Sequence, residues 1–330
     1  MLTWLVTGGC GFIGTRLIDH LVKEKGHRII VLDNLTVGTK EDLGAVCVFS
    51  ESDSLNDPPD KQVHLIRGDI KDKNICLKAS EYADVIVHLA ANTGVGPSVE
   101  DPEADMQNNV FGTFNMLEAA RLNKVGRFIF ASSGAPVGEC EPPIHEELAP
   151  HPVSPYGAGK LAGEGYCSAY YRTFGVETVA LRFGNVYGPG SGRKNSVVAK
   201  FIKQAMNGET LEIYGDGTQT RDFIYIDDLI TAIKLAQHTP GIGGETFQIA
   251  TNRETTVGEM VDLLLLVLNE NGITDVRVMH GEKRLGDVTR NFSDTSKARD
   301  RLNWTSRYDL RKGLKETVHY FLKRVNEQGR

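Results

Sequence analysis

The stretch Thr7-Gly8-Gly9-Cys10-Gly11-Phe12-Ile13-Gly14 decides the fold of this 330-residue chain. It follows the apolar run Leu2–Val6 and opens a segment with helical spacing, Ile13–Lys25. A glycine-rich turn between a strand and a helix lets a pyrophosphate approach the backbone and meet the free N–H groups of the helix N-terminus. The stretch therefore predicts a dinucleotide-binding turn.

A second feature lies in register with this turn. Asp33 stands 19 residues after Gly14, at the end of the second β-rich run. A carboxylate there can accept hydrogen bonds from a ribose diol and would repel a 2′-phosphate. Asp33 could instead only cap a turn together with Asn34. Because the turn and the acid occur together, we expect NAD(H) as cofactor rather than NADP(H).

Outward from the turn, β-rich runs alternate with segments of helical spacing. The runs are Leu2–Val6, Arg28–Leu32, Gln62–Ile66, Asp84–Leu89, Arg127–Ala131 and Thr178–Arg182, and the helical segments are Ile13–Lys25, Glu103–Leu122 and Tyr156–Phe174. This alternation predicts an α/β fold, a Rossmann-type doubly wound parallel sheet with strands buried on both faces. The stretch Thr36–Lys61 is rich in Gly, Ser, Asp and Pro and is expected to form an insertion or a long loop.

The pattern changes after Tyr187, which predicts a smaller mixed α/β substrate domain at the C-terminal end. We expect a cofactor domain over residues 1–186, with residues 223–250 returning to it, and a substrate domain over residues 187–330. The elements expected in the second domain are Ser196–Asn207, Thr210–Tyr214, a short strand near Arg277, Val257–Asn269 and Asp309–Val325.

Composition excludes several classes of protein. The 37 basic and 43 acidic side chains give a net charge of −6, which argues against a nucleic-acid binder. The longest apolar run, Met260–Leu268, is far shorter than the ~20 residues that span a bilayer, and the N-terminus has no signal-peptide pattern. The five cysteines are widely spaced without a CxxC pair. They predict reduced thiols in a cytoplasmic protein, with neither a disulfide framework nor a metal site.

A chemical signal lies at the start of the third helical segment. Tyr156 and Lys160 are four residues apart, so they share one face of a helix. A nearby ammonium and a positive nicotinamide ring would favour the phenolate and lower the pKa of the phenol. Ser133, just beyond a predicted strand, could hydrogen-bond a substrate oxygen beside the phenol. Alternatively, Tyr156 and Lys160 could be ordinary surface residues, and Ser133 could only cap the end of the strand.

Together these residues resemble the extended short-chain dehydrogenase/reductase family, most of all its nucleotide-sugar epimerases, typified by the UDP-glucose 4-epimerases. The resemblance runs along nearly the whole chain. Its further landmarks are His88-Leu89-Ala90-Ala91, Asn109–Thr113, Arg182–Pro189, Gly215–Gly217, Thr220–Phe223 and Arg284–Val288.

The resemblance implies a role for each matching residue. For the cofactor it implies Gly8, Gly11, Phe12, Ile13 and Gly14 at the pyrophosphate, Asp33 and Asn34 at the adenosine ribose, Asp69 and Ile70 beside the adenine, Leu89, Ala90 and Ala91 as lining, and Asn109 as support. Ser133, Tyr156 and Lys160 match the catalytic triad, of which Tyr156 and Lys160 also contact the cofactor. For the substrate it implies Asn185 at the sugar diphosphate, Arg221 and Arg284 at the phosphates, Asp287 at the nucleoside ribose, and Glu212 and Tyr214 at the base.

Each polar member has a structural alternative. Arg221 and Arg284 could form surface ion pairs, Asp69 could end a strand, and Asn185 could occupy a turn. An arginine within Thr-Arg-Asp-Phe nevertheless suits bidentate recognition of a phosphate.

The chain departs from the family after Ser133, where it reads Gly134-Ala135-Pro136-Val137-Gly138. Ala135 lacks the hydroxyl that is usual there. Neither Gly134 nor Ala135 can supply the acid that 4,6-dehydratases and UDP-glucuronate decarboxylases need, which disfavours both activities. Thr93 also stands where some galactose epimerases have a lysine near the cofactor, and this would weaken NAD retention.

The resemblance thus implies C4 epimerisation of a UDP-hexose or UDP-N-acetylhexosamine through a 4-keto intermediate, with Tyr156 as base and acid. A nucleotide-4-keto-sugar reductase, a UDP-uronate 4-epimerase that reads the carboxylate with Arg193 or Lys194, and a non-catalytic NAD-binding subunit are the alternatives. The helices Glu103–Leu122 and Tyr156–Phe174 match those that relatives pair across a dimer, so we expect a homodimer; their apolar residues could equally pack on the sheet.

Overall fold

The computed structural model describes residues 1–52, 61–194, 196–282 and 289–328. Its main element is an eight-stranded sheet in the order β12-β7-β6-β5-β1-β2-β4-β3, in which all neighbouring strands are parallel. The strands are β1 (Leu2–Thr7), β2 (His27–Asp33), β3 (Phe49–Glu51), β4 (Val63–Arg67), β5 (Val85–His88), β6 (Arg127–Ser133), β7 (Thr178–Phe183) and β12 (Glu245–Ile249). The predicted parallel sheet is confirmed.

The strand order reverses at β1. Strands β2, β4 and β3 extend to one side of it, and β5, β6, β7 and β12 extend to the other. At such a switch point a crevice opens outside the carboxyl ends of the strands, because the two following connections leave toward opposite faces of the sheet. The glycine turn that follows β1 therefore lies at the place where this fold binds ligands.

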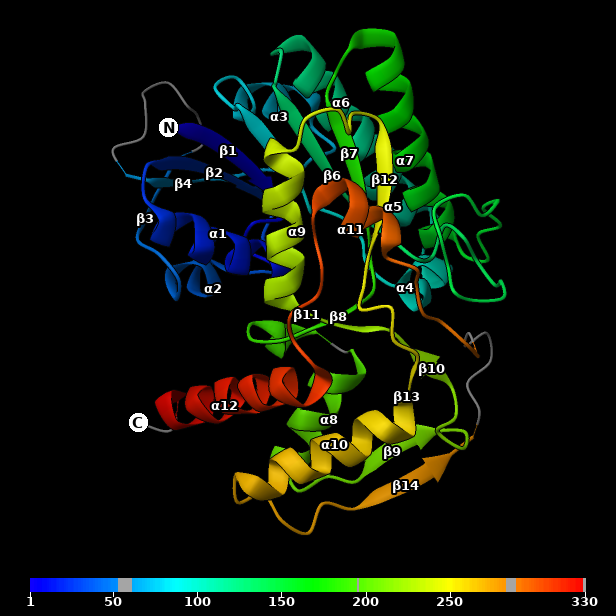
Figure 1. The fold of residues 1–330 in the computed structure, drawn as a ribbon. Coiled ribbons are helices and arrows are strands. Elements are labelled where there is room, and N and C mark those ends of the chain that lie inside the picture. The colour runs from blue at the N-terminus through cyan, green and yellow to red at the C-terminus, as the bar shows by residue number, and fades with distance from the viewer. Residues whose placement is uncertain (53–60, 195, 283–288, 329–330) are drawn as a thin grey trace.

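Helices cover both faces of the sheet (Figure 1). Helices α1 (Phe12–Glu24) and α9 (Ile226–His238) lie on one face, and α3 (Lys73–Ala79), α6 (Gly112–Leu122) and α7 (Pro155–Phe174) lie on the other. Alternate residues of β1 accordingly enter two different cores: Val6 packs with Leu17 of α1, whereas Leu5 packs with Met116 of α6. This burial on both sides explains why the strands lack polar alternation.

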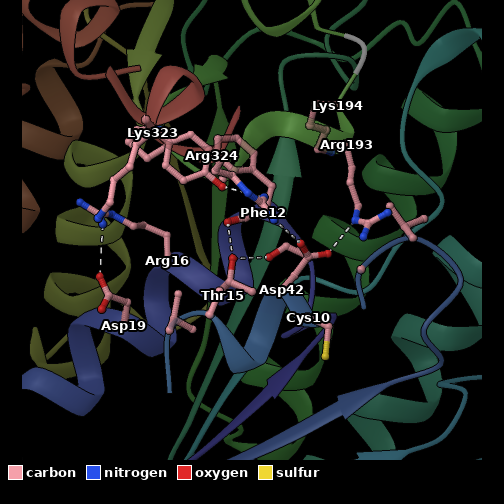
Figure 2. Close-up of a pocket in the computed structure, with 18 residues that line it drawn as sticks. Cys10, Phe12, Thr15, Arg16, Asp19, Asp42, Arg193, Lys194, Lys323 and Arg324 are labelled. Atoms are coloured by element: carbon pink, nitrogen blue, oxygen red, sulfur yellow. Dashed lines mark hydrogen bonds and ion pairs between the residues drawn. The ribbon is translucent and has the colours of Figure 1, made fainter. Parts of the chain in front are cut away.

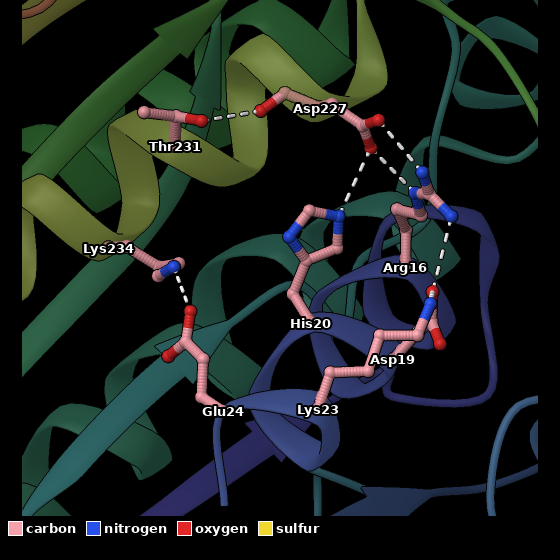
Figure 3. A network of polar contacts seen from close by, with 8 residues as sticks. All are labelled: Arg16, Asp19, His20, Lys23, Glu24, Asp227, Thr231 and Lys234. Carbon is pink, nitrogen blue, oxygen red and sulfur yellow. Dashed lines mark hydrogen bonds and ion pairs between the residues drawn. The ribbon is translucent and has the colours of Figure 1, made fainter.

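A polar contact ties α1 to α9 (Figure 3). Arg16 donates from Nε and Nη2 to the two carboxylate oxygens of Asp227 at 2.6 and 2.8 Å, and His20 Nε2 lies 3.3 Å from the same carboxylate. Burial raises the pKa of Asp227, but the bonds from His20 and Arg16 outweigh it and hold that pKa well below its usual range. The first helix is thus locked to a helix 211 positions later in sequence.

Most of the elements that follow β7 form a smaller lobe, at the bottom of Figure 1. Its helices are η2 (Ser191–Arg193), α8 (Val197–Met206), α10 (Val257–Glu270) and α12 (Leu310–Gln328), and its strands are β8 (Asn185–Tyr187), β9 (Leu211–Tyr214), β10 (Thr220–Arg221), β11 (Phe223–Tyr225), β13 (Thr255–Thr256) and β14 (Val278–Gly281). The strands pair as β8 with β11, β9 with β14 and β10 with β13. Among the described residues, no helix is long and apolar enough to cross a membrane.

Several segments after residue 186 return to the main sheet. Helix α9 packs on the sheet, β12 pairs with β7, and α11 (Ser296–Leu302) packs against β12 and α9. Residues after 187 therefore contribute to both regions, and the division into two domains stays a prediction.

Two segments differ from the sequence expectation. Thr36–Lys61, expected as an insertion or long loop, contains α2 (Lys40–Gly44) and β3 among its described residues, because Thr39 and Asp42 form a capping box that starts a short helix. Glu103–Leu122, expected as one helix, is helical throughout and differs only in the π-turn η1 (Gln107–Phe111) between α5 (Pro102–Met106) and α6; α4 (Val95–Glu100) precedes it.

Candidate active site

The glycine turn after β1 has no room for side chains. Gly8 adopts a φ of +67°, and a Cβ there would stand 2.8 Å from the amide nitrogen of Ala90. A Cβ at Gly14 would stand 2.5 Å from the carbonyl oxygen of Gly8. The turn therefore packs closely against both the loop after β5 and the start of α1. This close approach leaves the backbone bare, as a bound pyrophosphate requires.

A cavity of about 480 Å³ opens beyond this turn. It lies at the carboxyl ends of the central strands, the position that the switch point predicts. The sequence-predicted residues that line it are Gly8, Gly11, Phe12, Ile13, Gly14, Asp33, Asn34, Asp69, Ile70, Leu89, Ala90, Ala91, Ser133, Tyr156 and Lys160. The structure thus brings together the residues expected at the cofactor, Asn109 excepted, and those expected at the reacting carbon.

Asp33 is fixed at the end of β2. One carboxylate oxygen accepts from the Cys10 amide at 2.9 Å, and the other accepts from the Leu35 amide at 2.8 Å. Burial raises the pKa of Asp33, and these two backbone bonds oppose the rise. Asn34, the neighbour of Asp33 in the chain, donates from Nδ2 to Asp69 at 3.1 Å. Asp33 and Asp69 therefore lie at the same end of the cavity. A bare glycine turn beside a fixed carboxylate fits a dinucleotide with a free ribose diol.

Tyr156, Lys160 and Ser133 converge on the far part of this cavity. Ser154 caps α7 by accepting from the Gly157 amide at 3.1 Å, so the phenol and the ammonium sit in its first two turns. Lys160 donates from Nζ to the carbonyl oxygen of Ala131 at 2.8 Å, and its Nζ lies 5.9 Å from the centre of the Tyr156 ring. Ser133, at the end of β6, lines the same cavity, and its hydroxyl is close enough to the phenol of Tyr156 to influence its pKa.

Burial governs the protonation of this pair. It raises the pKa of Tyr156, and the nearby hydroxyl of Ser133 opposes the rise without cancelling it. It lowers the pKa of Lys160 to about 8, against the charges of Asp105 and Glu164. Within the chain itself, loss of water around the phenolate outweighs the contacts that favour it, and the lowering expected beside a bound nicotinamide ring stays a prediction.

A buried ionic cluster beneath the pair was missed by the sequence analysis. Glu164 accepts from Ser132 Oγ at 2.5 Å and from Nε and Nη2 of Arg182, both at 2.8 Å. All three residues are buried. The cluster ties α7 to β6 and β7 directly below Lys160. Its only sequence signal is Glu164 standing four residues after Lys160, on the same face of the helix.

Asn109 is buried but does not line the cavity. Its side chain accepts from the Asn92 amide and donates to the Asn92 carbonyl, each at 2.9 Å. Asn92 itself lines the cavity. Asn109 therefore acts on the loop after β5 rather than on the cavity directly.

The described residues that were expected only at the substrate are not in the cavity wall. Asn185 is exposed at the start of β8, next to the cavity-lining Gly184 and Val186. Arg221, in β10, donates from Nη1 to the Thr220 carbonyl at 2.7 Å. The other residues expected at the substrate are Glu212 and Tyr214, on β9, and Arg284 and Asp287, which lie outside the described residues. The described members are not brought to the cavity wall, so their roles stay predictions.

A second cavity of about 320 Å³ lies on the other side of the glycine turn (Figure 2). Arg193 lines it and donates to Asp42 at 2.6 Å. Lys194 lines both this cavity and the cofactor cavity. Of the two cations that the sequence left open for a uronate, Lys194 is the one that faces the cofactor cavity.

The five cysteines are free thiols in the structure. Within residues 1–52, 61–194, 196–282 and 289–328, no three His, Cys, Asp or Glu side chains gather as a metal site would need.

Comparison with known proteins connects this geometry to a family. Residues 4–250 match the family described as NAD dependent epimerase/dehydratase family. The chain is 36% identical over 322 residues to a UDP-glucose 4-epimerase of Mycolicibacterium smegmatis, covering 96% of this chain and 97% of that protein.

Solved structures agree with this match. The UDP-glucose 4-epimerase of Thermotoga maritima with UDP-glucose superposes with a TM-score of 0.87 at 34% identity, covering 98% of this chain and 100% of that one. The UDP-glucuronic acid 4-epimerase of Bacillus cereus, in complex with UDP-glucuronic acid and NAD, superposes with a TM-score of 0.86 at 31% identity, covering 98% and 99%.

These findings confirm the resemblance drawn from the sequence, the Rossmann-type fold and the NAD cofactor. They also confirm the predicted class of enzyme, a nucleotide-sugar 4-epimerase. This chain belongs to the NAD dependent epimerase/dehydratase family.

Proposed function

We propose that this chain epimerises a UDP-hexose or UDP-N-acetylhexosamine at C4, with Tyr156 as the group that takes and returns the proton. The observation that carries the proposal is the convergence of Ser133, Tyr156 and Lys160 beside the cavity that holds the predicted cofactor residues. The relatives named above, which act on UDP-sugars, support the substrate class.

The cofactor NAD⁺, when bound, supplies the acceptor for the hydrogen at C4. Gly8 and Gly14 leave room for its pyrophosphate, and Asp33 meets its adenosine ribose. Ser133 orients the sugar 4-hydroxyl toward the phenol of Tyr156. Because burial disfavours the phenolate, the buried Lys160 ammonium and the positive charge of the cofactor are needed to stabilise it.

The 4-keto sugar must then turn over before the hydrogen returns to the other face. We assign the diphosphate anchor to Asn185, Arg221 and Arg284, as the family resemblance implies, with Asp287 at the nucleoside ribose. The strand that carries Glu212 and Tyr214 is assigned to the base. Because the sugar rotates about a fixed diphosphate, one bound cofactor can serve both faces of the sugar at C4.

A UDP-uronate 4-epimerase is the second candidate. The observation that favours it is Lys194, which lines the cofactor cavity and whose electrostatic effect on Lys160 shows that the two ammonium groups are near each other. A uronate carboxylate would pair with that second cation. Variant Lys194→Met separates the two candidates, since it would depress turnover of a uronate and spare a neutral hexose.

The deciding experiment incubates the purified protein with UDP-hexoses, UDP-N-acetylhexosamines and UDP-uronates without added reductant. Conversion of one sugar to its C4 epimer supports the proposal. A separate arm supplies a 4-keto nucleotide sugar and NADH; stoichiometric consumption of NADH there, with no epimerisation in the first arm, would identify a reductase instead. Absence of conversion despite tight NAD binding would identify a non-catalytic subunit.

We further propose that the chain acts as a homodimer in the cytoplasm. Exposed apolar side chains gather on the helices α5 to α7: Met106, Phe111, Tyr166 and Phe174 are each 40% or more exposed. Exposed apolar side chains on helices that pack against one another suit pairing with a second copy. A monomer mass in sedimentation at micromolar concentration would contradict the dimer.

A further inference from the structure

A buried acid stands behind the Tyr156–Lys160 pair. Asp105, in α5, is only 1% exposed. Its Oδ1 accepts from Asn109 Nδ2 at 2.9 Å, while Oδ2 is buried without a hydrogen-bond partner among the described residues. A carboxylate oxygen buried in this way costs free energy, so the position calls for an explanation.

The local backbone turns this acid toward the active site. Helix α5 runs directly into the π-helix η1, a rare form that recurs at functional sites. Both segments pack against α7. A Cβ at Gly159 would stand 3.0 Å from Asn109 Cβ and 3.4 Å from Asp105 Oδ2. Because Gly159 precedes Lys160 and lies three residues after Tyr156, the carboxylate faces the turn of α7 that carries both.

Several charged or titratable groups surround the pair, and they differ in how well they are compensated. Those that act on Tyr156 or Lys160 are Asp105 from α5, Glu164 and Cys167 from α7, His88 from β5, and Lys194 from the loop after η2. Glu164 is neutralised by the two bonds from Arg182. Asp105 has no ion pair among the described residues, so no neighbouring cation of its own offsets its charge. Burial raises the pKa of Asp105, and the bond from Asn109 and the charge of Lys160 oppose that rise.

We propose that Asp105 is a positioning residue for proton transfer: its carboxylate faces the α7 turn and holds the proton on the Tyr156–Lys160 pair. This inference rests on the proposed epimerase function. Asp105 helps the ammonium stay charged, because burial lowers the pKa of Lys160 and the charges of Asp105 and Glu164 limit that fall to about 8. It also helps the phenol keep its proton while the sugar is a ketone, since a nearby anion disfavours the phenolate.

The sign of the effect does not depend on which residue of the pair titrates. A negative charge favours the protonated form of both the phenol and the ammonium. Removing it makes the pair lose its proton at lower pH, whichever group carries the change. Variant Asp105→Asn removes the charge and keeps the shape and an oxygen for the bond from Asn109. Variant Glu103→Gln is the matched control, because it removes an exposed charge from the same helix.

The first readout is single-turnover reduction of bound NAD⁺ by UDP-glucose, UDP-N-acetylglucosamine and UDP-glucuronate across a pH series. We expect Asp105→Asn to move the midpoint of the profile about one unit toward lower pH, and Glu103→Gln to leave it in place. The second readout needs no substrate: the tyrosinate absorbance of each holoenzyme is titrated against its own Tyr156→Phe derivative, and the same shift is expected.

The results separate the possible roles. An unmoved midpoint in Asp105→Asn, with or without a lower maximal rate, overturns the inference, because it leaves Asp105 only a structural part. An equal shift in Glu103→Gln also overturns it. If wild type reduces NAD⁺ with none of the three sugars, the proposed function fails, and the tyrosinate titration still decides the role of Asp105. Should Asp105→Asn not fold, Asp105→Ser removes the same charge with a smaller side chain.

Discussion

Replacing Tyr156 by phenylalanine removes one hydroxyl and keeps the ring. The ring still fills its half-buried site, with Lys160 Nζ 5.9 Å from its centre. What is lost is the interaction of the hydroxyl with Ser133, which contributes at most the ~0.5–1.5 kcal/mol of a neutral hydrogen bond. The phenylalanine no longer buries a hydroxyl, which offsets part of that loss. We therefore expect the free energy of unfolding to change by about 1 kcal/mol or less.

The rate is affected far more than the stability. A general acid–base group contributes about 10²–10⁴-fold, which corresponds to about 3–5 kcal/mol in the barrier. Single-turnover reduction of bound NAD⁺ by a UDP-sugar, followed by absorbance, measures this loss. Ser133→Ala is the matched control, because it removes the same interaction but leaves the proton carrier, and its loss of rate should be smaller. Near-wild-type reduction in Tyr156→Phe would refute the assignment of the base.

Three further perturbations test other parts of the site. Gly8→Ala forces a side chain into a positive-φ position against backbone, at about 1–2 kcal/mol of strain, and is expected to weaken NAD binding about tenfold or more, so an unchanged Kd would argue against the predicted cradle. Glu164→Gln leaves Arg182 buried with an uncompensated charge and should lower the free energy of urea unfolding by about 3–5 kcal/mol. The double variant Glu164→Gln/Arg182→Met should recover part of this, and additive losses would contradict the pairing. Burial lowers the pKa of His88 from 6.5 to about 3, so the folded chain favours the neutral ring. The free energy of unfolding therefore falls by up to about 1.4 kcal/mol per pH unit as the pH drops below 6.5. His88→Gln should flatten that slope in unfolding curves, and an equally steep slope in the variant would assign the acid sensitivity to other groups.

The features that sequence reasoning predicted are local ones. The turn Thr7–Gly14, the helix that follows it and the acid at the end of β2 are joined by short connections, so residue types and spacing define them. Tyr156 and Lys160 share a helix face by spacing alone. The same reasoning could extend to Ser133 only because strand ends meet at one edge of a parallel sheet.

The features that it missed depend on contacts between distant segments. A π-helix shifts the hydrogen bonds of η1 without changing the apolar pattern, so the spacing predicts the helix Glu103–Leu122 but not the π-turn within it. The sequence alone therefore does not distinguish Asp105 from an exposed acid on a helix, because its burial depends on the packing of α7 against α5. The pairing of Glu164 with Arg182 likewise appears only when β7 lies beneath α7.

The position of β12 beside β7 has a consequence for folding. The two strands pair in parallel although Phe183 ends one and Glu245 begins the other, with β8, α8, β9, β10, β11 and α9 between them. Until these elements and β12 have been synthesised, Thr178–Phe183 is an unprotected edge with apolar side chains and open backbone hydrogen-bonding groups. A nascent or truncated chain that stops soon after β7 therefore offers a template for aggregation, and docking of β12 removes it.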